Sequence, residues 1–135
     1  MADAIFSGTE ADSILNALTG QGTYTAPAGV YVQCHTAAPG SAGTTAVASL
    51  STRKQALFAT PSSGGAGTVS NTTAVQWTTG FANETITDVS VWSTVTANTR
   101  FLGSIQLTTP KTTTTSTDTL TIGIGALTFS LTHAS

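Results

Sequence analysis

The side chains of this sequence best suited to nucleophilic or acid–base chemistry are one cysteine and two histidines. Cys34 and His35 are neighbours in a stretch typical of a β-strand. Neighbouring side chains on a strand point to opposite faces, so the two cannot form a nucleophile–base pair. His133 lies close to the last residue, where we expect a solvated side chain. Cys34 is therefore predicted to be a small buried hydrophobic residue.

The six carboxylates are scattered too widely for paired acid–base work. Glu84 and Asp88 stand in an extended segment about 13 Å apart, beyond the roughly 5–9.5 Å of a glycosidase pair. Asp3, Glu10 and Asp12 lie near the start, where acidic residues ordinarily stabilise a helix N-terminus. Histidine, cysteine and carboxylate are too few for a typical metal site. We predict a protein that is not an enzyme, with no catalytic residue, no cofactor and no metal.

The composition is poor in charge and rich in threonine. Charged residues make up 7% of the 135 residues, against roughly 25% in an ordinary domain, whereas 30 residues are threonine. The hydroxyl groups either replace charge on a solvated β surface, or much of the surface contacts neighbours in an assembly, where Lys, Glu and Asp are depleted. Composition leaves both interpretations open.

The charge distribution and hydropathy exclude two classes of partner. The net charge is −2 and the four basic residues form no cluster, whereas a nucleic-acid interface needs several phosphate-neutralising cations. No apolar run approaches the roughly 18 residues of a membrane span. The start has no basic region followed by an apolar stretch, so we expect no secretory signal. We predict no nucleic-acid partner and no membrane partner.

One segment near the start has the pattern of an amphipathic helix. Its apolar residues recur at helical spacing: Ala11, Ile14, Leu15 and Leu18. Thr9 is the predicted N-cap, with Asp12 three residues on, and Gly20 is the predicted left-handed residue after the helix. We expect this helix to lie against a sheet or a partner subunit.

The rest of the chain has the alternation and turn signals of β-strands with one buried face. The expected strands are Val30–Thr36, Lys54–Ala59, Thr68–Asn71, Ala74–Trp77, Thr85–Ser93, Arg100–Thr108, Asp118–Ile124 and Leu127–Thr132. Residues 108–117 are expected to form a polar connection or an exposed arm. Trp77 and Trp92 are predicted to lie in the core. The sequence predicts an all-β fold, mainly an antiparallel β-sandwich (Ig-like or jelly-roll-like) with one short N-terminal amphipathic helix. We expect an arm and helix over 1–22 and the sandwich over 23–135, within a single domain.

The order of these segments resembles a family of small tailed-phage virion structural proteins, labelled minor capsid, head decoration or tail-fibre-like. The resemblance is carried by Ala11–Leu18, Tyr24–Pro27, Val30–Gly40, Arg53–Ala56, Val69–Trp77, Ile86–Trp92, Phe101–Thr112 and Asp118–Leu131. The sequence departs from the family's pattern at Val95–Asn98 and at Ala46–Thr52, both in expected connections. The resemblance implies a virion location and repeated copies on a symmetric lattice, and it brings no catalytic residues.

We therefore expect a bacteriophage virion protein, most simply a capsid decoration (cement) protein on the outer head shell, made in the cytoplasm of the host bacterium. The expected partners are the major capsid protein and copies of itself, as a homotrimer or other symmetric oligomer. The alternative is a tail or head-fibre component with a receptor- or glycan-binding role. An ice-binding threonine array would need a fixed repeat, which is missing. The residues predicted to contact partners are Ile5, Phe6, Ile14, Leu15, Leu18 and Tyr24.

Overall fold

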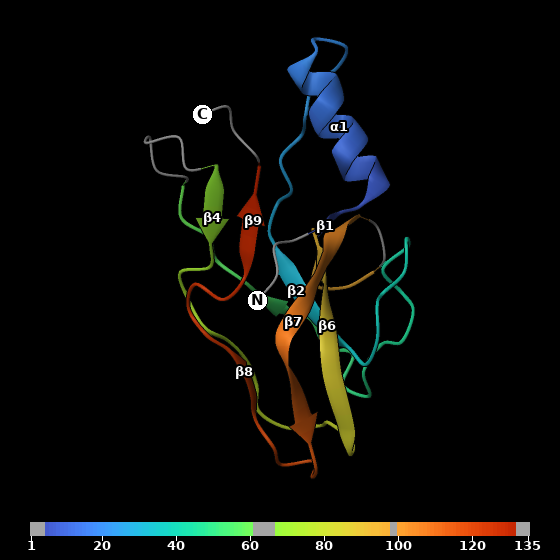
Figure 1. The fold of residues 1–135 in the computed structure, drawn as a ribbon, viewed down its shortest axis with the longest axis vertical. Coiled ribbons are helices and arrows are strands. Elements are labelled where there is room, and N and C mark those ends of the chain that lie inside the picture. Colours follow the sequence, from blue (N-terminus) through green and yellow to red (C-terminus); the bar gives the residue numbers. More distant parts are fainter. Residues whose placement is uncertain (1–4, 61–66, 98–99, 132–135) are drawn as a thin grey trace.

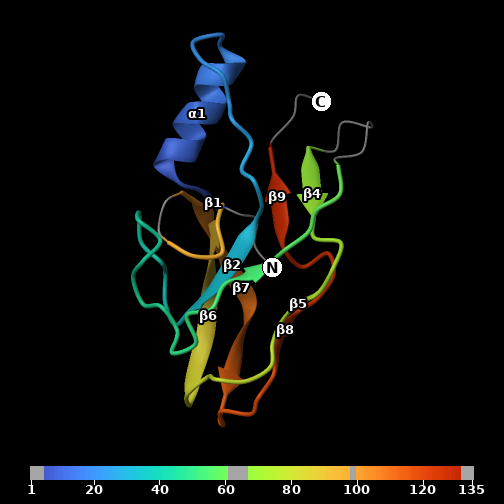
Figure 2. The same cartoon turned by 180° about the vertical axis from the view of Figure 1, so that it is seen from behind.

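The computed structural model describes residues 5–60, 67–97 and 100–131, and its main element is a five-stranded antiparallel sheet. The strands follow the order β1 (Ile5–Phe6), β7 (Phe101–Thr113), β6 (Glu84–Trp92), β2 (Tyr31–His35) and β3 (Lys54–Gln55). Two antiparallel ribbons lie to one side of this sheet (Figures 1 and 2): β4 (Thr68–Ser70) with β9 (Thr128–Ser130), and β5 (Val75–Trp77) with β8 (Leu120–Ile122). The all-β prediction with one short N-terminal helix is confirmed.

The hydrophobic core lies between the five-stranded sheet and the ribbons. The sheet contributes Val32, Cys34, Ile86, Val89, Val91, Ile105 and Leu107, and the ribbons contribute Val75, Trp77, Leu120 and Ile122. Each fully buried side chain of this size contributes about 1.5–3 kcal/mol. The Trp77 indole also donates to the Thr52 carbonyl at 2.8 Å. The prediction that Trp77 and Cys34 lie in the core is confirmed.

The other face of the sheet is also buried at β2 and β6, which corrects our expectation that the strands have only one buried face. The segment between β2 and β3 is bonded to this face: the His35 ring lies 2.7 Å from the Thr45 carbonyl oxygen and 2.7 Å from the Ser90 hydroxyl. The Arg53 guanidinium stacks 3.9 Å from the centre of the Trp92 ring. This chain segment covers the polar side chains of β2 and β6. These side chains alternate with apolar ones, a pattern that predicts exposure to solvent, yet they are buried. Trp92 is buried, as predicted, but outside the main core.

Helix α1 (Gly8–Leu18) begins earlier than the sequence predicted. Its N-cap is Ser7, whose side chain accepts from the Glu10 amide at 3.3 Å and donates to the Phe101 carbonyl at 2.7 Å. Thr9 lies inside the first turn, so the prediction of Thr9 as N-cap is wrong. Gly20 has φ +76°, which confirms it as the left-handed residue after the helix.

Several strands differ from their predicted bounds. β7 continues to Thr113, so residues 108–113 belong to the sheet instead of a connection. Pro110 lies where the register between β6 and β7 shifts, since Asp88 pairs with Gln106 and Ile86 with Lys111. A missing amide is tolerated in such an irregularity. The predicted strand over 54–59 is reduced to β3 and one bridge between Phe58 and Asn71.

The predicted division of the chain into an arm with a helix over 1–22 and a sandwich over 23–135 stays a prediction.

Candidate docking groove

An apolar groove of about 500 Å³ opens at one end of the molecule. Helix α1 and the segment that follows it line one side, and the ribbon β4–β9 lines the other. Figures 1 and 2 show that these elements lie at the same end of the molecule. Its apolar lining consists of Phe6, Ile14, Pro27, Val30, Phe58, Ala59, Val69, Leu102, Phe129 and Leu131. The groove is thus the open end of the space between the two layers.

Three aromatic rings make contact along the groove. The Phe129 ring lies 5.9 Å from the Phe6 ring and 5.3 Å from the Phe58 ring, the second pair in an edge-to-face arrangement. Phe58 and Phe129 also pack against the core cluster. Since aromatic pairs of this geometry add about 0.5–1.5 kcal/mol beyond their buried area, this part of the groove is preformed.

An ion pair between a buried carboxylate and a partly exposed arginine fixes the side of the groove formed by α1. The Glu10 carboxylate lies 2.5 Å from Nε and 3.0 Å from Nη2 of Arg100, and it accepts from the Tyr24 hydroxyl at 3.1 Å. The bonds from Arg100 lower the pKa of Glu10 although burial opposes the shift, and burial together with Glu10 raises the pKa of Tyr24. Among the described residues that line the groove, Glu10 is the only charged one, and it is paired with Arg100.

The residues predicted to contact partners divide into two sets. Phe6, Ile14 and Tyr24 line the groove. The other three are exposed outside it, with exposed fractions of 74% for Ile5, 56% for Leu15 and 79% for Leu18. The apolar stripe of α1 is therefore only partly covered by the rest of the described chain.

The opposite side of the groove was missed by sequence reasoning. Phe58, Val69 and Phe129 come from three segments that are distant along the chain from α1. The signal available was the alternation of Leu127, Phe129 and Leu131, which predicts one apolar face. The structure shows that burial along this face decreases from Leu127, fully buried, to Leu131, which is exposed. An apolar strand face that extends from the core to the surface therefore indicates the position of the groove.

The residues with reactive side chains are engaged elsewhere. Burial raises the pKa of the Cys34 thiol to about 12, with a further contribution from Glu84. His35 lies on the opposite face of β2, bonded to Thr45 and Ser90, so the predicted separation of the two side chains is confirmed. Among the residues that the structure describes, no three His, Cys, Asp or Glu side chains are grouped closely enough to hold a metal ion.

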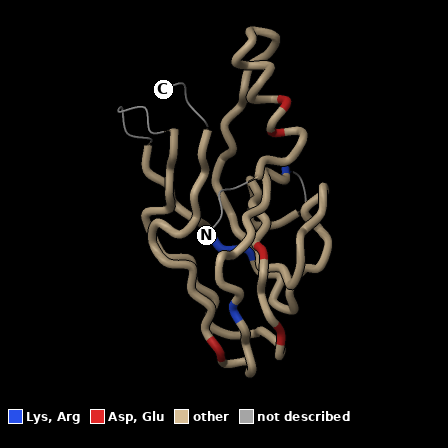
Figure 3. The backbone as a smooth tube through the Cα atoms, in the orientation of Figure 1, with Lys and Arg blue, Asp and Glu red and all other residues tan. Residues whose placement is uncertain are grey.

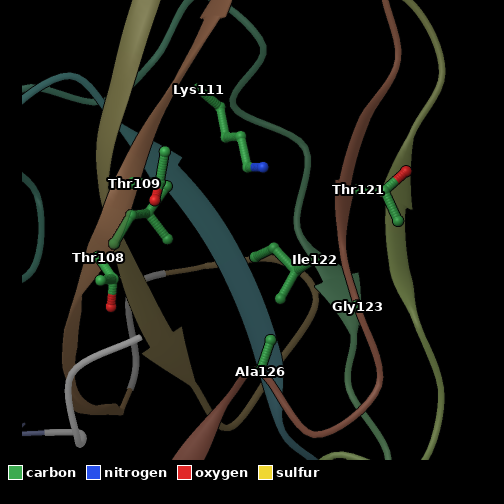
Figure 4. A pocket seen from close by; sticks show the side chains of 8 residues that line it. Thr108, Thr109, Lys111, Thr121, Ile122, Gly123 and Ala126 are labelled. Atoms are coloured by element: carbon green, nitrogen blue, oxygen red, sulfur yellow. The ribbon is translucent and has the colours of Figure 1, made fainter.

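A smaller cavity of about 180 Å³ lies between the end of β7 and β8. Figure 4 shows Lys111 of β7 and Ile122 of β8 extending into the space between the two strands. The other lining residues are Leu107, Thr108, Thr109, Thr121, Gly123 and Ala126. The lining contains one lysine and several hydroxyl groups but no histidine or carboxylate that could act as a general base, so we assign no chemistry to this cavity.

Comparison with known proteins relates this structure to one family. The family model described as podophage GP4 fiber I protein gp80 matches residues 6–130. The match includes α1, every strand after β1 and nearly all of the groove. No curated protein matches the chain. No helix in the described ranges is long and apolar enough to cross a membrane.

Proposed function

This chain belongs to the podophage GP4 fiber I protein gp80 family, and from that premise we propose that it is a fibre component of the particle. Membership makes it a phage structural protein and a component of the virion. The proposal has two parts. The chain lies in a fibre, and it attaches to neighbouring virion proteins through the groove and the exposed face of α1.

The uncovered apolar groove is the observation that carries this proposal. Contiguous exposed apolar surface on a small protein marks sites of interaction with other proteins. Leu15 and Leu18 are exposed beside a groove lined by aromatic rings, and each such leucine contributes about 1.5–3 kcal/mol when it becomes buried. A charge-poor chain with this surface is suited to permanent assembly.

We also propose that the chain is not an enzyme. Its cysteine is buried and protonated, and both ring nitrogens of His35 have hydrogen-bond partners. Glu10 is bound by Arg100, and Glu84 accepts from Ser49. These residues act in holding the fold together, which leaves adhesion as the function that the described surface supports.

Decoration of the head shell, which the sequence alone favoured, is the second candidate. The absence of a shaft-like repeat in the sequence favours it, whereas the family description favours the fibre. In both cases the major capsid protein or a tail protein would be the neighbour, with further copies of the chain. A receptor- or glycan-binding role stays a prediction.

Quantitative mass spectrometry of purified particles tests this proposal. A fibre component is expected in a handful of copies per particle and in the tail or fibre fraction after the particles are disrupted. Hundreds of copies in the head fraction would instead support decoration of the shell. Absence from purified particles, in lysates where the protein is abundant, would contradict both.

A further inference from the structure

We propose that the edge of β9 beside the groove binds an extended segment of a neighbouring virion protein as an added β-strand. An apolar residue of that segment enters the groove opposite Phe129. This inference rests on the proposed function, which takes the groove as an attachment site, and it specifies the conformation and the side-chain pattern of the occupant. The evidence is a row of backbone hydrogen-bonding groups along one side of the groove.

The outer edge of β9 presents backbone groups that β4 does not use. The Leu131 N–H donates to the Gly67 carbonyl at 2.7 Å, so Leu131 and, two residues earlier, Phe129 direct their backbone groups toward β4. Because this direction alternates along an antiparallel strand, the N–H and C=O groups of Thr128 and Ser130 point away from β4. Within the described ranges, no residue forms a backbone hydrogen bond with these groups.

This edge borders the groove. Figures 1 and 2 both show β9 between β4 and the segment that follows α1. That segment lines the groove through Tyr24, Pro27 and Val30, and β9 lines it through Phe129 and Ser130. Since β4 occupies one side of β9, the unused backbone groups lie on the side of the groove.

The side chains around Phe129 define what the added strand must carry. The Phe129 ring contacts those of Phe6 and Phe58 on the face of β9 that packs against the core. Residues directly opposite each other on paired strands share a face, with Cβ atoms about 4.5–5.5 Å apart. The residue opposite Phe129 therefore enters the apolar lining, and its two neighbours lie beside Thr128 and Ser130. We expect a segment in which apolar residues alternate with small polar ones.

The backbone edge distinguishes this occupant from other apolar ones. A helix uses its backbone N–H and C=O groups internally, so it can fill the apolar space but cannot pair with β9. An extended segment does both, because strand addition joins main-chain hydrogen bonds to pockets for alternate side chains.

The edge of β9 also lacks the features that keep strand edges from pairing with other chains, which are charges, bulges or a covering segment. β7 carries Lys111 beside its register shift with β6, and β3 carries Lys54. The outer side of β4 is covered at its end, where the Thr72 N–H donates to the Leu57 carbonyl at 2.7 Å. Neither strand of the ribbon β4–β9 contains a charged residue, and its tube is tan throughout in Figure 3.

Hydrogen exchange in the free chain and in the particle measures this pairing. In the purified chain, the Thr128 and Ser130 amides should exchange quickly, whereas the Phe129 amide, which pairs with Val69, should exchange slowly. In intact particles we expect the Thr128 and Ser130 amides to exchange about tenfold more slowly than in the free chain, because they then donate to the added strand. The Phe129 amide, protected in both states, is the internal control.

Variants of Ser130 test the same pairing by competition. Ser130→Pro removes an N–H that does not bond to β4, and its ring occupies the place of the added strand. Ser130→Ala is the matched control, since it keeps the N–H and loses only the hydroxyl, which lies 3.3 Å from that of Thr68. Each variant is expressed together with the unmodified chain during infection, and mass spectrometry compares their ratio in purified particles with that in the lysate. We expect S130P to be depleted about tenfold and S130A to enter particles like the unmodified chain. Circular dichroism of the purified variants checks that both are folded, and hydrogen exchange of the unmodified chain decides if S130P is not.

Three results would overturn the inference. The first is equally fast exchange of the Thr128 and Ser130 amides in the free chain and in the particle, since another kind of occupant then covers the groove. The second is slow exchange of these amides in the free chain: in dilute solution a segment of the same chain covers the edge, and only in concentrated solution a second copy does. The third is folded S130P that enters particles as readily as S130A.

The failure of this inference differs from that of the proposed function. A chain counted in the fibre fraction, with fast exchange at the edge of β9, would remove this inference and leave the proposed function intact. Absence of the chain from particles would remove the proposed function and the partner with it.

Discussion

At the scale of single residues, Glu10 connects three parts of the chain that are distant in sequence. It lies in α1 and binds Arg100 before β7 and Tyr24 after the helix. Hydrogen bonds to charged groups contribute about 1.5–3 kcal/mol when they are shielded from water. This single carboxylate therefore sets the position of the helix that borders the groove.

Replacing this carboxylate by an amide tests its role. Glu10→Gln should lower the free energy of unfolding by about 1–3 kcal/mol, because Arg100 loses its charged partner. Urea denaturation followed by circular dichroism measures the change. Asp12→Asn, on the exposed surface of the same helix, is the control and should change stability by less than about 0.5 kcal/mol. Equal losses in both variants would contradict the assignment.

His35 makes the stability of the protein depend on pH. The Thr45 carbonyl can only accept, so Nδ1 carries the proton and donates it, which leaves Nε2 to accept from the Ser90 hydroxyl. Burial is the main cause that lowers the pKa of His35 from its ordinary 6.5, although the Thr45 bond and Asp88 oppose the shift. The folded state therefore favours the neutral ring. Its contribution is complete above the unfolded pKa and is lost as the pH falls below 6.5 and through the folded pKa.

A comparison of two histidine variants isolates this effect. The unmodified chain should lose stability as the pH is lowered from about 8 to about 5, and His35→Gln should show a smaller loss over the same interval. His133→Gln should keep the full pH dependence; His133 lies outside the described residues, and its solvated state stays a prediction. The measurement is the free energy of unfolding at each pH. A pH dependence that is reduced in His133→Gln and unchanged in His35→Gln would contradict the account.

At the scale of the elements, local sequence patterns predicted the presence of the helix and most strands, although several of their first and last residues were predicted wrongly. The helical stripe, Gly20 and the strand alternation were readable because they depend on residues close in sequence. Ser7 was missed as N-cap because its hydroxyl also bonds to Phe101, a partner that no local pattern indicates. β7 was predicted too short for the same reason: Pro110 lies at a register shift between β6 and β7, which only the pairing of the two strands shows.

Variants of the two candidate caps separate these interpretations. Ser7→Ala should destabilise the protein by about 1 kcal/mol, because it removes the cap and the bond to Phe101. Thr9→Ala should be neutral or slightly stabilising, since Thr9 lies inside the helix, where alanine is favoured. Thermal unfolding monitored at the helical circular dichroism band distinguishes the two. A larger loss of stability in T9A than in S7A would instead support Thr9 as the N-cap, as the sequence predicted.

The attachment of β1 depends on a glycine. A Cβ atom at Gly103 would overlap the carbonyl oxygen of Ile5, the neighbouring residue in the pairing of β1 with β7. Gly103→Ala should therefore displace β1, at a cost of about 1–3 kcal/mol. Hydrogen exchange of the Ser7 amide, which donates to the Leu102 carbonyl, should accelerate. Gly123→Ala, where a Cβ meets no atom within 4 Å, is the control and should leave this exchange unchanged.

At the scale of the whole molecule, the described residues leave one end of the interior open as the groove. The five-stranded sheet and the ribbons enclose the core over most of their length, and the groove continues that core to the surface. Three of the residues that the sequence predicted as partner contacts, Phe6, Ile14 and Tyr24, line the groove. Their contact with a partner stays a prediction. The other side depends on how β4 and β9 pair, which is a property of the folded chain. The low content of charged residues left two interpretations open, a solvated β surface or contact with neighbours in an assembly, and the apolar groove supports the assembly that we propose.

Electron cryomicroscopy of the purified particle, with the chain placed in the density, tests the central claim most directly. We predict that the chain lies in a fibre and that the groove of each copy is covered by a neighbouring protein. A chain on the particle whose groove faces solvent, or one placed on the head shell, would contradict this account.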